Sequence, residues 1–454
     1  MTKTDSGKID MTQGPLLSKI LIFSLPLIAS STLQLLFNAA DIVVVGRFAG
    51  AHAMGAVGAN SSLINLFVNI FTGLSIGANV VAAKYMGAKK EDEVSQTVHT
   101  AILIAFYGGL LMLIIGLLIA SPVLRLMGTP EEIISMASLY LKIYFCGMPI
   151  MLLYNFGAAL LRAIGDTKRP LFFLLIAGVV NVILNLFFVI VCHMSVAGVA
   201  LATVLSQCIS TALVMRCLMK MEGAMKLFLR KADLVVNVER LREIIQVGIP
   251  AGLQGVVFSL SNILIQSSVN SFGAEAVAGN TAAQNIEGFV YMSMNASHQA
   301  CVSFTSQNFG ARKPDRIFKV MLLCIMTAVV TGLLLGFGGY FAGEKLLSLY
   351  SGSGDVISVG MRRLSIILTT YFLCGFMEVP VGTMRGMGFG VTPMIISLLG
   401  ACAFRVIWIF TVFAGYHTLE ILYISYPVSW VLTGTVQTLA ALYCISMIRK
   451  RMEG

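Results

Sequence analysis

Long stretches of the chain contain no Asp, Glu, Lys or Arg, and they constrain the fold more than any other feature of the sequence. The longest runs from 170 to 215, and others cover 48–83, 100–124, 143–161, 244–274, 320–343 and 421–448. About 20 apolar residues are enough to cross the hydrocarbon core of a bilayer. Only 11% of the residues are charged, whereas soluble domains carry about 25%. The composition therefore excludes a soluble enzyme, a nucleic-acid-binding domain and a disordered regulator.

Several of these runs are too long for one crossing, and His193 and Ser195 divide the longest into two helices. We predict an all-α integral membrane protein with twelve transmembrane helices. Their expected limits are 16–46, 53–83, 95–121, 133–161, 169–192, 196–219, 241–271, 276–309, 317–343, 357–384, 391–415 and 420–448.

The positions of the basic residues predict the orientation in the membrane. Of the 31 Lys and Arg residues, 24 fall in the N-terminal tail, in alternate loops or in the C-terminal tail. Loops rich in Lys and Arg face the cytoplasm. We expect a multi-pass protein of the cell membrane with both termini cytoplasmic. An even number of spans likewise places both termini on the same side of the membrane. Residues 1–15 are polar and lack a cleavable signal pattern, so the first apolar run is expected to be a retained helix.

The chain repeats itself at a nearly fixed offset. Gly87-Ala88-Lys89-Lys90 recurs as Gly310-Ala311-Arg312-Lys313, and Arg162-Ala163-Ile164-Gly165 recurs as Arg385-Gly386-Met387-Gly388, both 223 residues later. Each half then holds six spans and enters the membrane in the same orientation, as in transporters built from parallel repeats. The expected parts are a cytoplasmic tail at 1–15, an N-lobe at 16–220, a cytoplasmic linker at 221–240, a C-lobe at 241–448 and a cytoplasmic tail at 449–454.

Catalytic and cofactor-binding motifs are missing from the sequence. It contains no G-x-x-x-x-G-K-[ST] phosphate loop and no H-E-x-x-H zinc motif. Gly73-Leu74-Ser75-Ile76-Gly77 matches the serine-hydrolase pattern, but that pattern requires a strand-to-helix turn and this match lies in the middle of an apolar span. The nine cysteines form no CxxC pair, and most lie in spans. We therefore predict that the chain is not an enzyme and has no cofactor.

Buried polar residues are the remaining functional candidates, because charges inside a membrane are costly and usually functional. Asp41 is the only acid between Asp10 and Glu91 and lies deep in the first span, with Gln34 on the same helical face. An exposed acid at a frayed helix end is the alternative interpretation. Asn181 and Asn185 lie one turn apart in the fifth span, and Thr203 of the sixth span is positioned to face them.

The eighth span is the most polar helix. A single stripe recurs along it at steps of three and four residues: Asn280, Gln284, Glu287, Tyr291, Asn295 and His298. Hydrogen bonds between helices explain Asn and Gln in such a stripe, but explain Glu287 and His298 poorly. We favour a water-lined substrate cavity. Glu378 and Arg405, in the tenth and eleventh spans, are candidates for a buried ion pair.

Several motifs together resemble the multidrug and toxic compound extrusion (MATE) family, over nearly the whole chain. They are Leu25-Pro26 with Asp41, Gly87-Ala88-Lys89, the stretch from Leu161 to Pro170, Gln307-Asn308-Phe309-Gly310-Ala311, and Met384-Arg385-Gly386-Met387-Gly388 followed by Pro393. The resemblance implies a V-shaped pair of six-helix lobes. It also implies an antiporter that exports organic cations and drugs in exchange for Na⁺ or H⁺.

The resemblance also implies a cation-coupling site in the N-lobe. Asp41, Asn181 and Thr203 match the positions that form this site in the family, and Asn155 matches a polar position near it. Asn185 stands where many members have Asp. With Asn185 included, these residues are the expected ligands if Na⁺ is the coupling ion. The acid that NorM-like members carry in the seventh span is absent here, so Glu287 would have to replace it.

Other classes of transporter remain as alternatives. A lipid-linked oligosaccharide or other metabolite flippase of the same superfamily shares the expected bundle, but needs a cationic cavity for its phosphate. A major facilitator is also built from six plus six helices, but its basic loop motif is not matched between 84 and 93. A membrane enzyme ranks third. The expected partners are organic cation substrates and the bilayer, with no nucleic acid, and the chain is expected to be a monomer.

Overall fold

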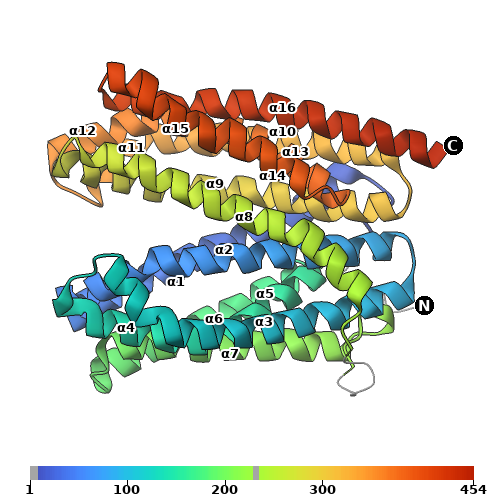
Figure 1. The fold of residues 1–454 in the computed structure, drawn as a ribbon, viewed down its shortest axis with the longest axis horizontal. Helices are drawn as coiled ribbons and strands as arrows, with labels where there is room; N and C mark the ends of the chain where they lie inside the picture. Colours follow the sequence, from blue (N-terminus) through green and yellow to red (C-terminus); the bar gives the residue numbers. More distant parts are fainter. Residues whose placement is uncertain (1–8, 229–234, 454) are drawn as a thin grey trace. The chain divides into compact units, whose positions relative to one another are not determined.

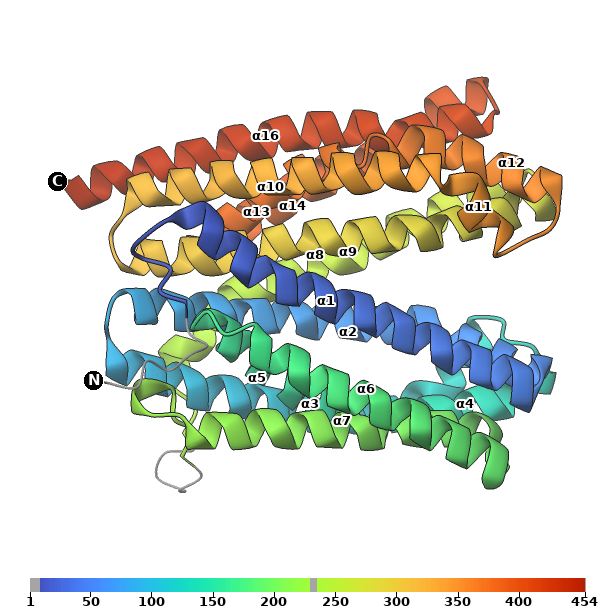
Figure 2. The same cartoon turned by 180° about the vertical axis from the view of Figure 1, so that it is seen from behind.

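The computed structural model describes residues 9–228 and 235–453, and within these ranges every regular element is helical. Three parts of the predictions lie outside the described residues: positions 1–8 of the N-terminal tail, positions 229–234 of the linker and Gly454. The long helices run side by side within each part of the molecule (Figure 1; Figure 2).

The helices follow the apolar runs closely. The α-helices of the first half are α1 (Leu16–Val44), α2 (Ala51–Gly87), α3 (Glu91–Leu126), α4 (Glu131–Cys146), α5 (Met148–Ala163), α6 (Lys168–Leu186) and α7 (Ser195–Lys220). Those of the second half are α8 (Val238–Asn270), α9 (Ala274–Gly310), α10 (Pro314–Phe341), α11 (Gly343–Ser348), α12 (Gly354–Arg363), α13 (Phe372–Gly386), α14 (Val391–Ser397), α15 (Phe404–Trp408) and α16 (Leu419–Glu453).

Short segments of tighter or wider helix complete the chain. Five are π-helical: η1 (Val45–Ala49), η2 (Phe187–Val191), η4 (Leu364–Leu368), η5 (Leu398–Ala403) and η6 (Ile409–Phe413). A 3-10 turn, η3 (Gly223–Met225), follows α7. The predicted break near His193 is confirmed, because His193 and Ser195 both adopt positive φ between η2 and α7.

The expected spans correspond to helices of the structure. Nine helical stretches in the described ranges are long and apolar enough to cross a membrane, and two bent helix pairs raise the number to eleven. The remaining predicted span is α9, which has 37 residues. A helix of that length is longer than the hydrocarbon core of a bilayer is thick. It is not among the eleven apolar spans because it is more polar than they are.

Two predicted spans are bent where the sequence analysis expected one continuous helix. The pair α4 and α5 bends by 48°, and the stretch from Gly354 to Leu368 bends by 45° against α13. At the first bend Gly147 interrupts the helix, and Pro149 occupies the first turn of α5. Proline lacks the N–H that would continue the preceding helix, so the start of a helix is a favourable place for it.

The chain packs into two compact units. Unit 1 comprises Met1–Ile9 and Ala29–Gly248, and unit 2 comprises Asp10–Ile28 and Ile249–Gly454. Packing therefore assigns the first half of α1 to unit 2 and the first eleven residues of α8 to unit 1. Within unit 1, α5 packs against α2, α3 and α7; within unit 2, α9 packs against α10, α12 and α13.

Large apolar side chains remain on the outside of both units. Leu118 is 72% exposed in unit 1, and Leu334 is 70% exposed in unit 2. In water such surfaces would associate, whereas lipid tails are as apolar as these side chains. The nine cysteines are all free thiols, as expected for small apolar residues of a membrane protein.

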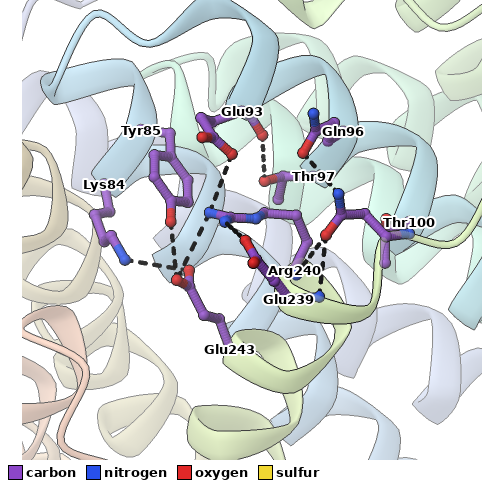
Figure 3. Close-up of polar contacts among 10 residues, drawn as sticks. Lys84, Tyr85, Glu93, Gln96, Thr97, Thr100, Glu239, Arg240 and Glu243 are labelled. Carbon is purple, nitrogen blue, oxygen red and sulfur yellow. Dashed lines mark hydrogen bonds and ion pairs between the residues drawn. The ribbon is translucent and has the colours of Figure 1, made fainter.

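The start of α8 is held in unit 1 by a cluster of charged groups (Figure 3). The amphipathic stretch from Val238 to Val247 forms the first part of the continuous helix α8. Arg240 is 5% exposed and lies 2.9 Å from Glu239, 3.3 Å from Glu93 and 3.6 Å from Glu243. Glu243 also accepts hydrogen bonds from Lys84 and Tyr85. These contacts join α8 to α2 and α3.

Candidate ion and substrate sites within the spans

Close packing of α1 on α6 positions the first polar cluster. A Cβ atom at Gly178 would collide with the ring of Phe37, so a larger residue there would force the ring or the helices to shift. Asp41 lies one turn after Phe37 on α1, and Asn185 lies two turns after Gly178 on α6. Residues spaced by one or two turns share a helical face. The contact between Phe37 and Gly178 therefore brings Asp41 and Asn185 together.

Asp41 and two asparagines form a small hydrogen-bonded group in unit 1. The Nδ2 atom of Asn185 donates to Oδ1 of Asp41 and, at 3.4 Å, to Oδ1 of Asn181. Asn185 is 1% exposed and Asn181 is 6% exposed, while Asp41 is half-buried. The Oδ1 atom of Asn185 is buried and has no hydrogen-bond partner. A buried acceptor without a donor is costly, so this oxygen is available to a proton donor or a cation.

The other predicted members of this site occupy more varied places. Thr203 of α7 is half-buried and donates its hydroxyl to the carbonyl of Val199 in its own helix. Asn155 of α5 is half-buried, and Gln34 of α1 is exposed. Tyr140 of α4, which the sequence analysis did not select, interacts electrostatically with Asp41. A lone tyrosine in an apolar span carries no sequence signal for such a role.

The atoms of Asp41, Asn181 and Asn185 that could bind a cation are all oxygens. One carboxylate and two amide oxygens suit a hard monovalent cation, and the carboxylate can alternatively take a proton. The described residues hold no group of three or more His, Cys, Asp or Glu side chains that would suit a transition metal. This chemistry fits Na⁺ or H⁺ and does not choose between them.

The second polar cluster lies in unit 2 and centres on a buried ion pair. Glu287 of α9 is 4% exposed, and both of its carboxylate oxygens accept hydrogen bonds of 2.8 Å from Arg363 of α12. Arg363 also donates to Asn280 at 2.8 Å, and Asn280 accepts a bond from Tyr423 of α16. The sequence analysis missed Arg363, although two adjacent bases at the start of a predicted span are an available signal.

This pair changes the physical basis of the prediction made for Glu287. The sequence analysis treated Glu287 as a carboxylate facing a water-lined cavity. The structure instead supplies a bidentate counter-ion, and a bidentate pair with Arg neutralises and orients the carboxylate. Asn280, Glu287 and His298 all bond to other helices. A role in lining a substrate cavity stays a prediction for this stripe.

The other buried charges of unit 2 also have partners. The Nδ1 atom of His298 donates a 2.8 Å hydrogen bond to the backbone carbonyl oxygen of Glu378 and lies 3.9 Å from the Glu378 carboxylate. Arg385 donates to Gln254 at 2.8 Å. The suggested pair of Glu378 with Arg405 is wrong: Arg405 donates to Ser429 and lies over the ring of Tyr426 at 4.2 Å. Sequence could not reveal this choice, because the alternative partners lie on a different helix.

Three members of the predicted stripe are more accessible. Gln284 is exposed, and Tyr291 and Asn295 are half-buried. Asn295 accepts a 2.9 Å hydrogen bond from Gln299. Unlike Glu287, these three residues are not fully buried.

Comparison with known proteins decides the family. The MatE family model matches the chain twice, at residues 26–187 and 250–411, which together exceed half its length. The chain belongs to the MATE family. The two matches begin 224 residues apart, next to the offset found in the sequence repeat, so the duplication is confirmed. MATE proteins are multi-pass membrane transporters, and the chain is a transporter rather than an enzyme, as predicted.

Relatives and solved structures agree with this assignment. The probable multidrug resistance protein YoeA of Bacillus subtilis is 29% identical over 90% of both chains. The multidrug export protein MepA of Staphylococcus aureus is 22% identical over 89% of both. A MATE transporter of the MOP superfamily, solved in an outward-facing conformation, superposes with a TM-score of 0.91 at 22% identity, over 99% of this chain and 100% of that one. The predicted all-helical MATE fold is thereby confirmed.

Proposed function

We propose that the chain is a secondary active antiporter that exports organic cations and drugs in exchange for Na⁺ or H⁺. The Asp41 carboxylate, hydrogen-bonded by the buried amide of Asn185, is the observation that supports this most directly. A carboxylate inside a membrane span is costly and is retained where it serves transport. The names of relatives, a multidrug resistance protein and a multidrug export protein, support drugs as the cargo.

The hydrogen bonding around Asp41 suits a group that changes state. An ionised Asp41 accepts a hydrogen bond from Nδ2 of Asn185. A protonated Asp41 has a hydroxyl that needs an acceptor, and a half-turn of the Asn185 amide presents its unpartnered Oδ1. The same oxygen, with that of Asn181, provides neutral ligands for Na⁺. Because a ligand shifts a conformational equilibrium only by its differential affinity, these two arrangements are what an exchanging ion would select.

We propose that the drug contacts the accessible part of the α9 stripe. Tyr291 offers an aromatic ring, which attracts organic cations through its negative face. Asn295 and Gln284 offer adaptable hydrogen-bonding groups beside it. Asn280, Glu287 and His298 then hold α9 in position from the buried side.

We propose that both termini and the linker at 221–240 face the cytoplasm. Basic residues gather at one end of unit 1: Arg169 at the start of α6 contacts Cys217 near the end of α7, and Lys84 near the end of α2 pairs with Glu243. Loops rich in Lys and Arg face the cytoplasm. In unit 2, Arg312, Lys313 and Arg449 lie at the corresponding loop and at the C-terminal end of α16.

One observation supports a second candidate, a flippase for a phosphate-bearing lipid. Arg385 and Arg405 are buried in unit 2, and each keeps one N–H group without a hydrogen-bond partner. Guanidinium groups bind phosphate well. Such groups would suit an anionic cargo better than an organic cation.

A transport assay separates the two candidates and identifies the ion. The purified protein in proteoliposomes is loaded with ethidium or norfloxacin, and efflux is followed under an imposed Na⁺ gradient and then under a pH gradient. We expect one gradient to drive efflux above the rate of protein-free liposomes. If neither gradient drives efflux, and a fluorescent lipid-linked phosphate changes leaflet instead, the antiporter proposal is wrong.

A further inference from the structure

Two hollows adjoin each other in unit 2 near the start of α10. The first, of about 390 Å³, is lined by four basic residues, Arg312, Lys313, Arg316 and Lys319, together with Pro314 and Asp315. The second, of about 410 Å³, is lined by Gly14, Leu16, Leu322 and Leu323 together with Arg316 and Lys319. Because both hollows share Arg316 and Lys319, a basic region passes directly into an apolar one.

The positive charge of the first hollow is largely uncompensated. Arg316 donates to the carbonyl oxygens of Gln13 and Gly14 at 2.8 and 2.9 Å, and Lys313 donates to that of Thr12 at 2.9 Å. Carbonyl groups satisfy the N–H donors but do not cancel the charge. Asp315 faces Arg449 in a separate ion pair. Arg312 and Lys319 are exposed and free to approach an anion.

The pKa of the nearby Asp10 carboxyl is lowered in part by positive charges of the same region. Burial raises the pKa of this group, but hydrogen bonds from Thr12 and the charges of Lys19 and Lys313 outweigh burial and lower its pKa below the usual value. The Asp10 side chain bonds within its own turn of the chain: its Oδ1 atom accepts hydrogen bonds from the backbone N–H and the hydroxyl group of Thr12. The single negative charge of ionised Asp10 is smaller than the summed positive charge of the basic residues around it.

The internal repeat indicates that the fold does not require basic residues at positions 316 and 319. The turn before α3 in unit 1 has the same geometry, with φ of 56° at both Lys89 and Arg312. At the offset of 223 residues, however, Arg316 corresponds to Glu93 and Lys319 to Gln96. The same turn is therefore built with an acid in place of Arg316 in the other half. The two bases that both hollows share, Arg316 and Lys319, are a property of the second half, and folding alone does not explain them.

We propose that these adjoining hollows bind one anionic phospholipid. Its phosphate lies among Arg312, Arg316 and Lys319, and the start of one acyl chain lies along Leu16, Leu322 and Leu323. Leu322 is 56% exposed and continues the apolar surface of α10. Basic pockets beside membrane helices suit such headgroups, and each base contributes to the attraction. A soluble phosphate would use only the first hollow and would leave the apolar one empty.

Lipid binding to the purified protein tests this directly and does not depend on transport. Native mass spectrometry measures the apparent Kd for phosphatidylglycerol and for phosphatidylcholine. We expect a clear preference for phosphatidylglycerol, and a roughly 30-fold loss of that affinity in Arg312→Gln/Lys319→Gln, because two surface charges are removed. Phosphatidylcholine binding should be unchanged. The matched control Arg125→Gln/Lys345→Gln removes two exposed bases elsewhere and should keep the wild-type affinity.

Two further measurements separate a lipid from a soluble anion. Leu322→Ala should weaken phosphatidylglycerol binding several-fold, because it shortens the apolar part of the site. Millimolar inorganic phosphate or glycerol 3-phosphate should not displace the lipid. Equal phosphatidylglycerol affinity in the wild type and the Arg312/Lys319 variant would overturn the proposal, and so would displacement of the lipid by inorganic phosphate. Failure of the transport assay would leave these outcomes unaffected.

Discussion

At the scale of single residues, the two acids Asp41 and Glu287 have opposite surroundings. Asp41 has a single amide donor and an unpartnered amide oxygen nearby. Glu287 has both oxygens bound by one guanidinium. An acid with neutral partners can change its charge at a modest cost, whereas an acid inside a bidentate pair cannot lose its charge without stranding a buried cation. The two residues therefore call for different experiments.

We predict that Asp41→Asn abolishes gradient-driven efflux. Asparagine keeps the size of the side chain but can neither bind a proton nor present a charge to Na⁺. The measurement is ethidium efflux from proteoliposomes, where the rate should fall to that of protein-free liposomes while drug binding persists. The exposed acid Asp355 provides the control, since Asp355→Asn should transport at the wild-type rate. Wild-type efflux in Asp41→Asn would remove this residue from the coupling mechanism.

We predict that Glu287→Gln destabilises the protein and reduces efflux of all substrates alike. The change leaves Arg363 buried without a counter-ion, which costs about 3–5 kcal/mol in a low-dielectric interior. The melting temperature of the purified protein should fall. Glu287→Gln/Arg363→Met removes both charges and should recover much of the loss. A selective loss of cationic drugs, with an unchanged melting temperature, would instead support direct substrate binding by Glu287.

At the scale of the helices, the approach of α1 to α6 determines whether the coupling residues meet. Gly178→Ala places a methyl group against Phe37, and the helices must separate or shift. We predict weaker efflux with a smaller effect on expression, because Asp41 and Asn185 lose their contact. Adding Phe37→Ala to Gly178→Ala should restore efflux, because the smaller side chain at position 37 makes room for the added methyl group. Gly58→Ala is the matched control, since nothing lies near its added methyl group, and equal losses in both variants would argue against this mechanism.

At the scale of the whole molecule, topology is the prediction with the widest consequences. Met225 is a natural position for a linker probe, but it is 4% exposed and packs in the core of unit 1. Glu222 and Gly352 are exposed and suit cysteine labelling better. In a background lacking the exposed Cys146 and Cys192, we expect Gly352→Cys to react with an impermeant maleimide added to intact cells. Glu222→Cys should react only after permeabilisation, and the reverse pattern would invert the orientation.

The features that depend on local chemistry could be predicted from the amino-acid sequence. Runs of apolar residues specify helices in lipid, because every backbone N–H and C=O must be satisfied within its own segment. The twelve helical stretches, the break near His193, the duplication and the isolation of Asp41 all follow from that constraint and from spacing along the chain. None of them depends on which helix lies beside which.

The partners of the buried charges could not be predicted from the sequence, because they depend on how the helices pack. Glu287 and Arg363 are separated by 76 residues in the sequence, and periodicity along α9 carries no information about the helix that packs against it. The same limit explains Arg405, which lies beside Ser429 and Tyr426 rather than Glu378. It also explains why α1 and α8 divide between the two units. A helix forms from local hydrogen bonds, but each charge inside it is stabilised by whichever opposite charge or polar group the packing of other helices brings within about 3 Å.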